Sequence, residues 1–393
     1  MLNILWKRVE PIFILGIDAS NIRGGGGVTH LVELLNAGEF GENNFSKAII
    51  WGGKDTLEKI GDSPYIEKIN LPLLNNSLPY RIFWQVFLFS AAAKKMGCDI
   101  LFVPGGSFST KFSPIVTISQ NLLPFESKEL FRFGRSFKTI KLLLLRYTQT
   151  RSFRRASGVI FLTKYAESTV RKITGKLSGQ AAIISHGLDE RFFSAPKIQK
   201  QIDQYSEKNP LRILYVSIVD VYKHQWHVVD AVAQLRRQGF PVCLDLVGPA
   251  YSPALKRLLG VLNDHDPLAQ FIKYLGAVSY EELHEHYASS DIFIFASSCE
   301  NLPNILLEAM ASGLPIACSS LGPMPEVLGD AGLYFDPESL SSIAEALRQL
   351  INSPELRIEK ATKAYQLAQQ YSWKRCAQET FQFLNKIARE KSV

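Results

Sequence analysis

Residues 299–315, CENLPNILLEAMASGLP, decide the fold because they connect a short apolar run to a helix. The run 292–295 is predicted to be a strand, and 304–312 a helix that begins beside a proline and ends at a glycine. Glu300 then lies in the loop at the carboxyl end of the strand, and Glu308 lies on the helix. Ligands of open parallel sheets bind in this crevice. The two carboxylates can accept hydrogen bonds from hydroxyl groups, and the free N–H groups of the helix start can hold phosphate oxygens.

This stretch resembles the E-x7-E signature of the retaining GT-B glycosyltransferases (glycosyltransferase group 1, family 4), which use nucleotide-sugars. Besides the spacing of Glu300 and Glu308, NLPN between them and EAMASGLP from the second Glu onward match the signature. The alternative is a solvated helix with one Glu at its favourable N-terminal end. The resemblance implies that Glu300 holds hydroxyls of the donor sugar and Glu308 those of the ribose. Asn301 and Leu302 stand where many relatives have Gly-Phe, and we expect them to contact the donor sugar.

Length and composition indicate a soluble protein of two domains. A chain of 393 residues is too long for one ordinary core, and 46% hydrophobic with 21% charged residues is typical of globular proteins. The apolar run 82–93 is too short to span a bilayer, and the N-terminal run leads directly to Asp18 and a glycine loop, as a first strand would. The five cysteines lack a C-x-x-C pair and fit reduced thiols, so we expect a cytoplasmic protein.

The net charge of +7 is concentrated between residues 128 and 176, where phenylalanines and leucines are interleaved with lysines and arginines. A basic segment with apolar side chains favours peripheral contact with an anionic membrane, here at its inner face. The alternative is a solvated helix face over core leucines. No nucleic-acid recognition motif accompanies the charge, so no nucleic-acid partner is expected.

Predicted strands and helices alternate along the chain, which indicates parallel sheets with helices on both faces, an α/β fold. Strands are predicted at residues 12–17, 48–51, 100–103, 116–118, 159–162 and 182–185, and again at 213–216, 242–247, 271–274, 292–295, 315–318 and 333–335. Helices are predicted at 28–35, 81–95, 137–155, 164–174, 225–237, 253–263, 280–289, 304–312, 339–351, 354–370 and 373–389.

Two doubly wound Rossmann-like domains facing across a cleft are the GT-B layout that the resemblance implies. We expect an acceptor-side domain at residues 1–190, a polar linker at 191–210 and a donor-side domain at 211–372. Residues 373–393 are then a last helix that packs back on the first domain.

Lys223 follows the strand 213–216 and precedes a helix, where a cation would hold a diphosphate. Relatives usually place an Arg about five residues before this Lys, but Ile218 stands there. The alternative for Lys223 is an exposed loop lysine.

Four glycines, Gly24 to Gly27, follow the first strand and open a helix, so that backbone can approach a ligand closely. They do not fit the G-x-G-x-x-G frame of dinucleotide-binding proteins. In relatives a similar loop faces the donor, which implies that Gly25 and Gly26 approach the donor phosphates. The alternative is a flexible turn.

Gln120 stands, after the strand 116–118, where relatives commonly carry His. Gln cannot titrate and so cannot serve as acid or base, but it can hydrogen-bond a sugar, and we keep it as a catalytic-site residue. Gly322 lies in a loop that resembles the G-G-x-P-E loop near the donor in relatives. His186 is expected to be structural.

No metal and no cofactor are expected. The sequence Asp264-His265-Asp266 is a D-x-D, but it is predicted to be a turn after a helix and not a strand end. Neither His224 with His227 nor His284 with His286 has a third ligand nearby.

The expected activity is transfer of a hexosyl or deoxyhexosyl group from a nucleotide-diphosphate sugar to a sugar or lipid-linked oligosaccharide acceptor, in cell-surface polysaccharide or glycolipid biosynthesis. The retaining mechanism implied by the resemblance needs mainly positioning and electrostatics from the protein. The alternatives are a non-catalytic nucleotide-sugar binding subunit, which Ile218 and Gln120 favour, and a GT-B sugar-nucleotide epimerase. A phosphorylase is disfavoured because no pyridoxal-lysine signature is seen.

Overall fold

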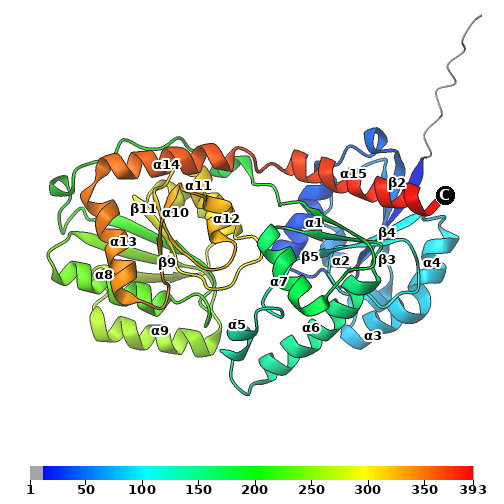
Figure 1. Ribbon diagram of the computed structural model, residues 1–393, viewed down its shortest axis with the longest axis horizontal. Helices are drawn as coiled ribbons and strands as arrows, with labels where there is room; N and C mark the ends of the chain where they lie inside the picture. Colours follow the sequence, from blue (N-terminus) through cyan, green and yellow to red (C-terminus); the bar gives the residue numbers. More distant parts are fainter. Residues whose placement is uncertain (1–11, 393) are drawn as a thin grey trace, which may run out of the picture.

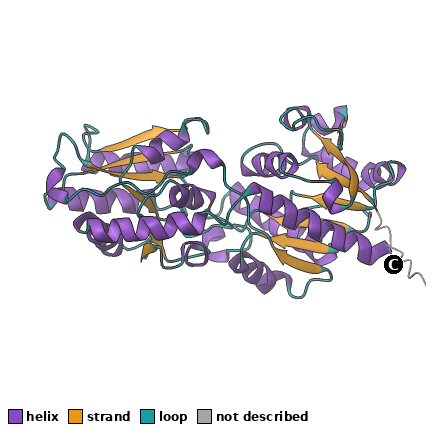
Figure 2. Cartoon of the chain, turned by 90° about the horizontal axis from the view of Figure 1, so that it is seen from above, coloured by secondary structure: helices purple, strands orange, loops and turns teal. Residues whose placement is uncertain are grey.

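A computed structural model describes residues 12–392, which form two domains, each built around one parallel sheet (Figure 1). The first sheet has seven strands in the order β3-β2-β1-β4-β5-β6-β7, and the second has six in the order β10-β9-β8-β11-β12-β13. Helices enclose the strands of both sheets (Figure 2). The predicted α/β class with two doubly wound sheets is confirmed.

The strands of the first sheet are β1 (Phe13–Ala19), β2 (Phe45–Gly52), β3 (Ile66–Asn70), β4 (Ile100–Val103), β5 (Ile115–Ser119), β6 (Gly158–Phe161) and β7 (Gln180–Ile183). Those of the second are β8 (Leu211–Val216), β9 (Val242–Val247), β10 (Ile272–Gly276), β11 (Ile292–Phe295), β12 (Ile316–Ser319) and β13 (Gly332–Phe335). The central strands are buried along their whole length, because helices cover both faces of a parallel sheet.

The helices of the first half are α1 (Gly26–Asn36), α2 (Lys54–Leu57), α3 (Leu78–Phe83), α4 (Phe89–Lys95), α5 (Ser127–Phe131), α6 (Phe137–Arg155) and α7 (Lys164–Thr174). Those of the second half are α8 (Gln225–Arg237), α9 (Ser252–His265), α10 (Leu283–Ala288), α11 (Asn304–Ala311), α12 (Met324–Leu328), α13 (Leu340–Asn352), α14 (Pro354–Ala368) and α15 (Trp373–Ser392). None of the helices between residues 12 and 392 has the length and apolar character needed to cross a bilayer.

The helix predicted at residues 81–95 is wrong in one respect, because a π-helical turn, η3 (Trp84–Leu88), separates α3 from α4. The wider turn allows two successive side chains, Trp84 and Gln85, to be buried. Gln85 Nε2 then donates to Asp18 Oδ2 at 2.6 Å, a partner 67 residues away that the local pattern does not show.

The last helix, α15, lies against the first domain although α14 packs on the second (Figure 1). Phe381 of α15 contacts the rings of Phe40 and Phe45, with centroids 4.9 and 6.0 Å apart. The chain therefore crosses between the domains twice, and the two crossings meet at a parallel bridge between Leu188 and Ser372.

Candidate active site

The order of strands reverses between β8 and β11 in the second sheet, and ligands of doubly wound sheets bind at such a switch point. Lys223 lies in the loop after β8, and Glu300 lies in the loop after β11. The first sheet reverses between β1 and β4, and the glycine loop follows β1. The topology therefore gathers three of the predicted site segments at strand ends.

Lys223 and Glu300 form a buried ion pair, in which Nζ contacts Oε1. The side chains are only 5% and 15% exposed. Nζ of Lys223 also lies 5.3 Å from the ring centroid of Phe295 and 5.2 Å from that of Tyr222, so the charge sits over two aromatic faces. One cation and one carboxylate are thus held together with little exposure to solvent.

Glu308 lies on α11 and is buried, and its Oε2 accepts a hydrogen bond from Tyr287 Oη at 2.9 Å. Burial raises the pKa of the Glu308 carboxyl to about 8, while the hydrogen bond from Tyr287 opposes this rise. At pH 7 this carboxyl is therefore mostly protonated, and hydrogen bonds donated by the hydroxyls of a ligand would favour its ionised form.

The glycine loop is open. α1 begins at Gly26, Gly25 has a φ of +62°, and a Cβ added at either would meet nothing within 4 Å. The conformation of Gly25 favours glycine, and no side chain caps the helix start. At Gly27 a Cβ would lie 3.2 Å from Oε1 of Gln120, so the end of this loop touches another predicted site residue.

Gln120 lies beside a buried histidine that the sequence analysis did not single out. Its Nε2 lies 3.2 Å from Nδ1 of His30, whose ring is 4.5 Å from that of His186. Burial and the neighbouring His186 lower the pKa of His30, and burial lowers the pKa of His186 to about 4, so both rings are neutral at pH 7. The amide of Gln120 therefore donates to a neutral His30. Nothing local in the sequence marks His30, because its partners come from other elements.

A small cavity of about 210 Å³ lies where the domains meet, lined by Gln120, Tyr222, Cys299, Glu300, Asn301 and Leu302. Asn301 also joins the domains, since its Nδ2 donates to the carbonyl of Ser119 at 2.6 Å and its own carbonyl accepts from Thr163 Oγ1 at 3.0 Å. Glu308 and the glycine loop do not line this cavity.

Gly322 lies in the loop after β12 with a φ of +64°, and a Cβ there would come 3.9 Å from the backbone nitrogen of Glu300. The next acidic residue in the sequence, Glu326, lies in the second domain and contacts the first. Its carboxylate accepts the backbone N–H groups of Lys164 and Tyr165, both at 2.8 Å, at the start of α7. No local motif of the sequence indicates this cap.

The Asp264-His265-Asp266 motif is only partly in a turn, because α9 extends through His265. Asp266 accepts the backbone N–H groups of Gln270, Phe271 and Ile272, each at 2.8 Å, and so fixes the entry to β10. Between residues 12 and 392 no cluster of three His, Cys, Asp or Glu side chains could hold a metal ion.

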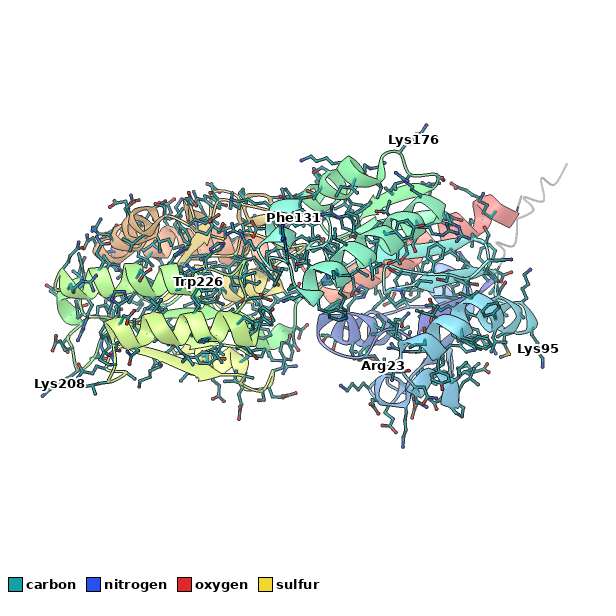
Figure 3. The ribbon with its side chains drawn as sticks, turned by 90° about the horizontal axis from the view of Figure 1, so that it is seen from below. Arg23, Lys95, Phe131, Lys176, Lys208 and Trp226 are labelled. Carbon is teal, nitrogen blue, oxygen red and sulfur yellow. The ribbon has the colours of Figure 1, made fainter. Side chains whose placement is uncertain are left out.

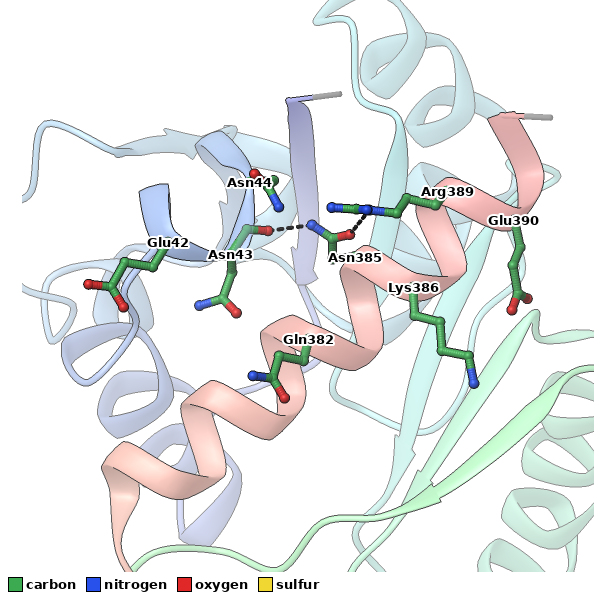
Figure 4. A pocket seen from close by; sticks show the side chains of 8 residues that line it. All are labelled: Glu42, Asn43, Asn44, Gln382, Asn385, Lys386, Arg389 and Glu390. Carbon is green, nitrogen blue, oxygen red and sulfur yellow. Dashed lines mark hydrogen bonds between the residues drawn. The ribbon is translucent and has the colours of Figure 1, made fainter. Parts of the chain in front are cut away.

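A separate cavity of about 470 Å³ lies on the first domain beside α15 (Figure 4). Asn385 Nδ2 donates to the carbonyl of Asn43 at 2.5 Å in its wall. None of the predicted site residues lines it.

Comparison with solved structures identifies the fold. Solved structures that share the whole architecture include a sucrose-phosphate synthase from Thermosynechococcus elongatus (TM-score 0.75, 17% identity, covering 96% of this chain and 100% of that one). Another is Anabaena Alr3699/HepE in complex with UDP (TM-score 0.65, 20% identity, covering 97% and 100%). The chain therefore has the fold of the GT-B glycosyltransferases, as the sequence predicts.

The second domain resembles a known family. Residues 210–353 match the model of the glycosyl transferases group 1 family. The O-antigen chain mannosyltransferase B of Escherichia coli is 36% identical over 110 residues. That match covers 28% of this chain and 29% of the mannosyltransferase.

Proposed function

We propose that this protein is a retaining glycosyltransferase that moves a hexosyl or deoxyhexosyl group from a nucleotide-diphosphate sugar to a sugar acceptor. The observation that carries the proposal is the Lys223–Glu300 pair at the switch point of the second sheet, with Glu308 buried on the following helix. Such a donor has a diphosphate, a transferred sugar and a ribose. Lys223 offers a cation for the diphosphate, and Glu300 and Glu308 offer carboxyl groups for the hydroxyls of the sugar and of the ribose.

In the proposed reaction, an acceptor hydroxyl oxygen bonds to the anomeric carbon while the bond from that carbon to the diphosphate breaks. The leaving phosphate oxygen takes the acceptor's proton on the same face, so no titrating residue is required at Gln120. Lys223 stabilises the negative charge that develops on the diphosphate. Glu300 orients the sugar, Glu308 orients the ribose, and Gly25 and Gly26 allow the first domain to approach the phosphates. Asn301, Leu302 and Gly322 surround the sugar.

The acceptor is proposed to be a sugar, carried on a lipid at the inner face of a membrane. Exposed apolar side chains on α6 support this proposal: Phe137, Leu144 and Tyr147 are 82, 62 and 67% exposed. Tyr80, Phe83 and Phe87, on α3 and η3 of the same domain, are also exposed. Apolar side chains beside basic ones suit an anionic lipid surface. The O-antigen relative is consistent with a role in cell-surface polysaccharide biosynthesis.

A thermal-shift titration against GDP-, UDP-, dTDP- and ADP-sugars tests the proposal, with Glu308→Ala as the control. A donor that binds the folded protein raises the melting temperature by mass action. We expect a shift with one nucleotide class that is lost in the variant, followed by release of the nucleoside diphosphate when an acceptor is supplied. Binding without turnover would instead favour a non-catalytic nucleotide-sugar binding subunit. No shift with any donor contradicts the proposal.

A further inference from the structure

We propose that a segment of the first domain, residues 129–138, positions Lys223 for the donor diphosphate by holding both ends of the loop that carries it. We call this segment the α5–α6 corner, and residues 220–224 the phosphate loop. The inference rests on the proposed function, since it assigns Lys223 to the diphosphate. The corner lies where the two domains meet: α5 faces the second domain in Figure 1, and Phe131 of α5 marks the junction in Figure 3.

The carboxyl-terminal end of the phosphate loop is held through a buried chain of hydrogen bonds. His224 Nε2 lies 3.0 Å from Ser298 Oγ, and Ser298 Oγ donates to Glu129 Oε2 at 2.7 Å. Arg132 Nε donates to the same Glu129 oxygen at 2.6 Å. His224, Ser298 and Glu129 are 1, 6 and 4% exposed. A carboxylate of the first domain is therefore linked, through one hydroxyl, to the neighbour of Lys223.

The hydrogen-bond partners determine where the protons lie in the series His224, Ser298 and Glu129. The single hydroxyl proton of Ser298 goes to the Glu129 carboxylate, so Nε2 of His224 must carry a proton and donate to Ser298. Burial and the nearby Arg132 lower the pKa of His224 to about 3, which keeps the ring neutral. Every link thus has a donor and an acceptor. Loss of the Ser298 hydroxyl breaks these hydrogen bonds, and loss of the Glu129 charge weakens them.

The other end of the phosphate loop is held by an ion pair. Nζ of Lys138 contacts Oδ2 of Asp220 at 2.9 Å, and the Asp220 side chain is 4% exposed. The same Nζ lies 4.0 Å from the ring centroids of Phe133 and Tyr251, one ring from each domain. Oδ1 of Asp220 accepts the backbone N–H of Val221 at 2.7 Å, so the ion pair is continuous with the backbone of the loop.

Apolar packing joins the same two segments. A separate buried cluster contains Leu123, Leu130, Phe133 and Leu142 of the first domain together with Cys299 of the second, and Val221, Tyr222 and Tyr251 pack against it. Val221 and Tyr222 of the phosphate loop therefore pack against a cluster that includes Leu130 and Phe133 of the α5–α6 corner. Because hydrogen bonds, an ion pair and packing all meet at five consecutive residues, the orientation of Lys223 depends on contact with the first domain.

These contacts also account for part of the basic segment between residues 128 and 176. Lys138 pairs with Asp220, while Lys128 and Arg132 both pair with Glu338 of the second domain. Three of its cations are thus engaged with the second domain.

The test compares affinities for nucleoside diphosphates and monophosphates by isothermal titration calorimetry on the full chain. The probes are UDP, GDP, dTDP and ADP with the matching monophosphates, and the measured quantity is the ratio of the monophosphate Kd to the diphosphate Kd. Ser298→Ala and Glu129→Gln are each expected to lower this ratio about threefold to tenfold, because a misplaced Lys223 loses a charge-assisted contact. The monophosphate Kd should stay within about twofold, since general unfolding would weaken both ligands alike.

Two controls separate the possible outcomes. Lys128→Gln breaks an exposed cross-domain ion pair but leaves the pairs of Arg132 with Glu338 and Glu129 in place, and its ratio should equal that of the unsubstituted protein. Lys223→Ala should lower the ratio at least as much as Ser298→Ala.

If Lys223→Ala lowers the ratio but Ser298→Ala, Glu129→Gln and Lys138→Met do not, the positioning role is wrong and the proposed function stands. If Lys223→Ala leaves the ratio unchanged, or if no nucleotide binds, the proposed function itself is contradicted, and this inference with it.

Discussion

Lys223 and Glu300, 77 residues apart in the chain, neutralise each other where β8 and β11 end. In the proposed donor complex each would exchange this partner for a group of the ligand, Lys223 for the diphosphate and Glu300 for the sugar. The pair therefore holds a cation and an acceptor next to each other, and each charge offsets part of the cost of burying the other.

Removing the charge of Glu300 is expected to separate binding from catalysis. In Glu300→Gln the ammonium group of Lys223 is no longer neutralised, so nucleoside diphosphate should bind about threefold to tenfold more tightly. The turnover number should fall by about 100-fold, because the sugar is no longer oriented. Calorimetry and a steady-state assay measure the two effects. Weaker diphosphate binding in this variant would show that Glu300 and the diphosphate do not compete for Lys223.

Gln120 is expected to act on the transferred sugar and not on the nucleotide, because it lines the small cavity together with Glu300. Gln120→Ala should lower the turnover number by about 10-fold or more and leave the nucleoside diphosphate Kd within about twofold. Gln120→His should add a titrating group, so that its pH–rate profile gains a limb near pH 6.5 that the unsubstituted protein lacks. Identical pH profiles for the two proteins would contradict this prediction.

The raised pKa of Glu308 predicts a pH dependence of stability. The folded protein holds this proton up to about pH 8, whereas an unfolded Glu releases it near 4.5. The unfolded state therefore binds fewer protons between these values, and stability should fall as pH rises through this window, by at most about 1.4 kcal/mol per pH unit from this group. Urea unfolding at pH 5 and pH 8 should show a smaller loss for Glu308→Gln than for the unsubstituted protein. Equal losses would place the pKa elsewhere.

Arg357 is expected to be the most costly cation to remove. Its guanidinium is fully buried and donates to the carbonyls of Leu350 and Ile351, at 2.6 and 2.8 Å, and to Gln199 of the linker at 2.8 Å. Arg357→Met leaves these acceptors unpaired and should lower the free energy of unfolding by about 3 kcal/mol. The control is Arg348→Met, which removes a partly exposed ion pair with Glu345 and should cost under about 1 kcal/mol. Similar losses for both would contradict the prediction.

Membrane contact is expected to depend on the exposed apolar side chains of α6. The double variant Phe137→Ser, Leu144→Ser should reduce co-sedimentation with vesicles containing anionic phosphatidylglycerol by at least about threefold at low salt. Leu268→Ser removes an equally prominent apolar side chain, 76% exposed, from the second domain and should have no effect. If the protein fails to sediment with anionic vesicles at all, the membrane proposal is wrong.

Local sequence determines much of this fold. The helices Phe137–Arg155, Lys164–Thr174 and Gln225–Arg237 have the predicted bounds, and the side chains of Ser136 and Thr163 cap the first two of them. The strand Ile66–Asn70 was not predicted, because IEKIN at a sheet edge is half-buried and lacks the apolar run of a central strand. Strength of local pattern therefore separates the elements that were predicted from those that were not.

The site could be predicted only as a set of separate residues. Lys223, Glu300 and Glu308 follow from motifs, but the contact between Lys223 and Glu300 depends on the order of β8 and β11 in the sheet. His30 and Glu129 carry no local signal, since their partners lie 90 and 169 residues away. Polar contacts of this kind become visible only in the folded chain, within the first domain for His30 and between the two domains for Glu129.

The position of α15 has a consequence for biosynthesis on the ribosome. Phe381 of α15 covers Phe40 and Phe45. Gly38 lies so close to Phe381 that a Cβ added at Gly38 would come within 2.7 Å of the Phe381 ring. The apolar surface beneath α15 is synthesised early in translation, but the helix that covers it emerges only after the entire second domain. The first domain thus spends most of translation with this surface uncovered, and its folding is completed last although its synthesis begins first.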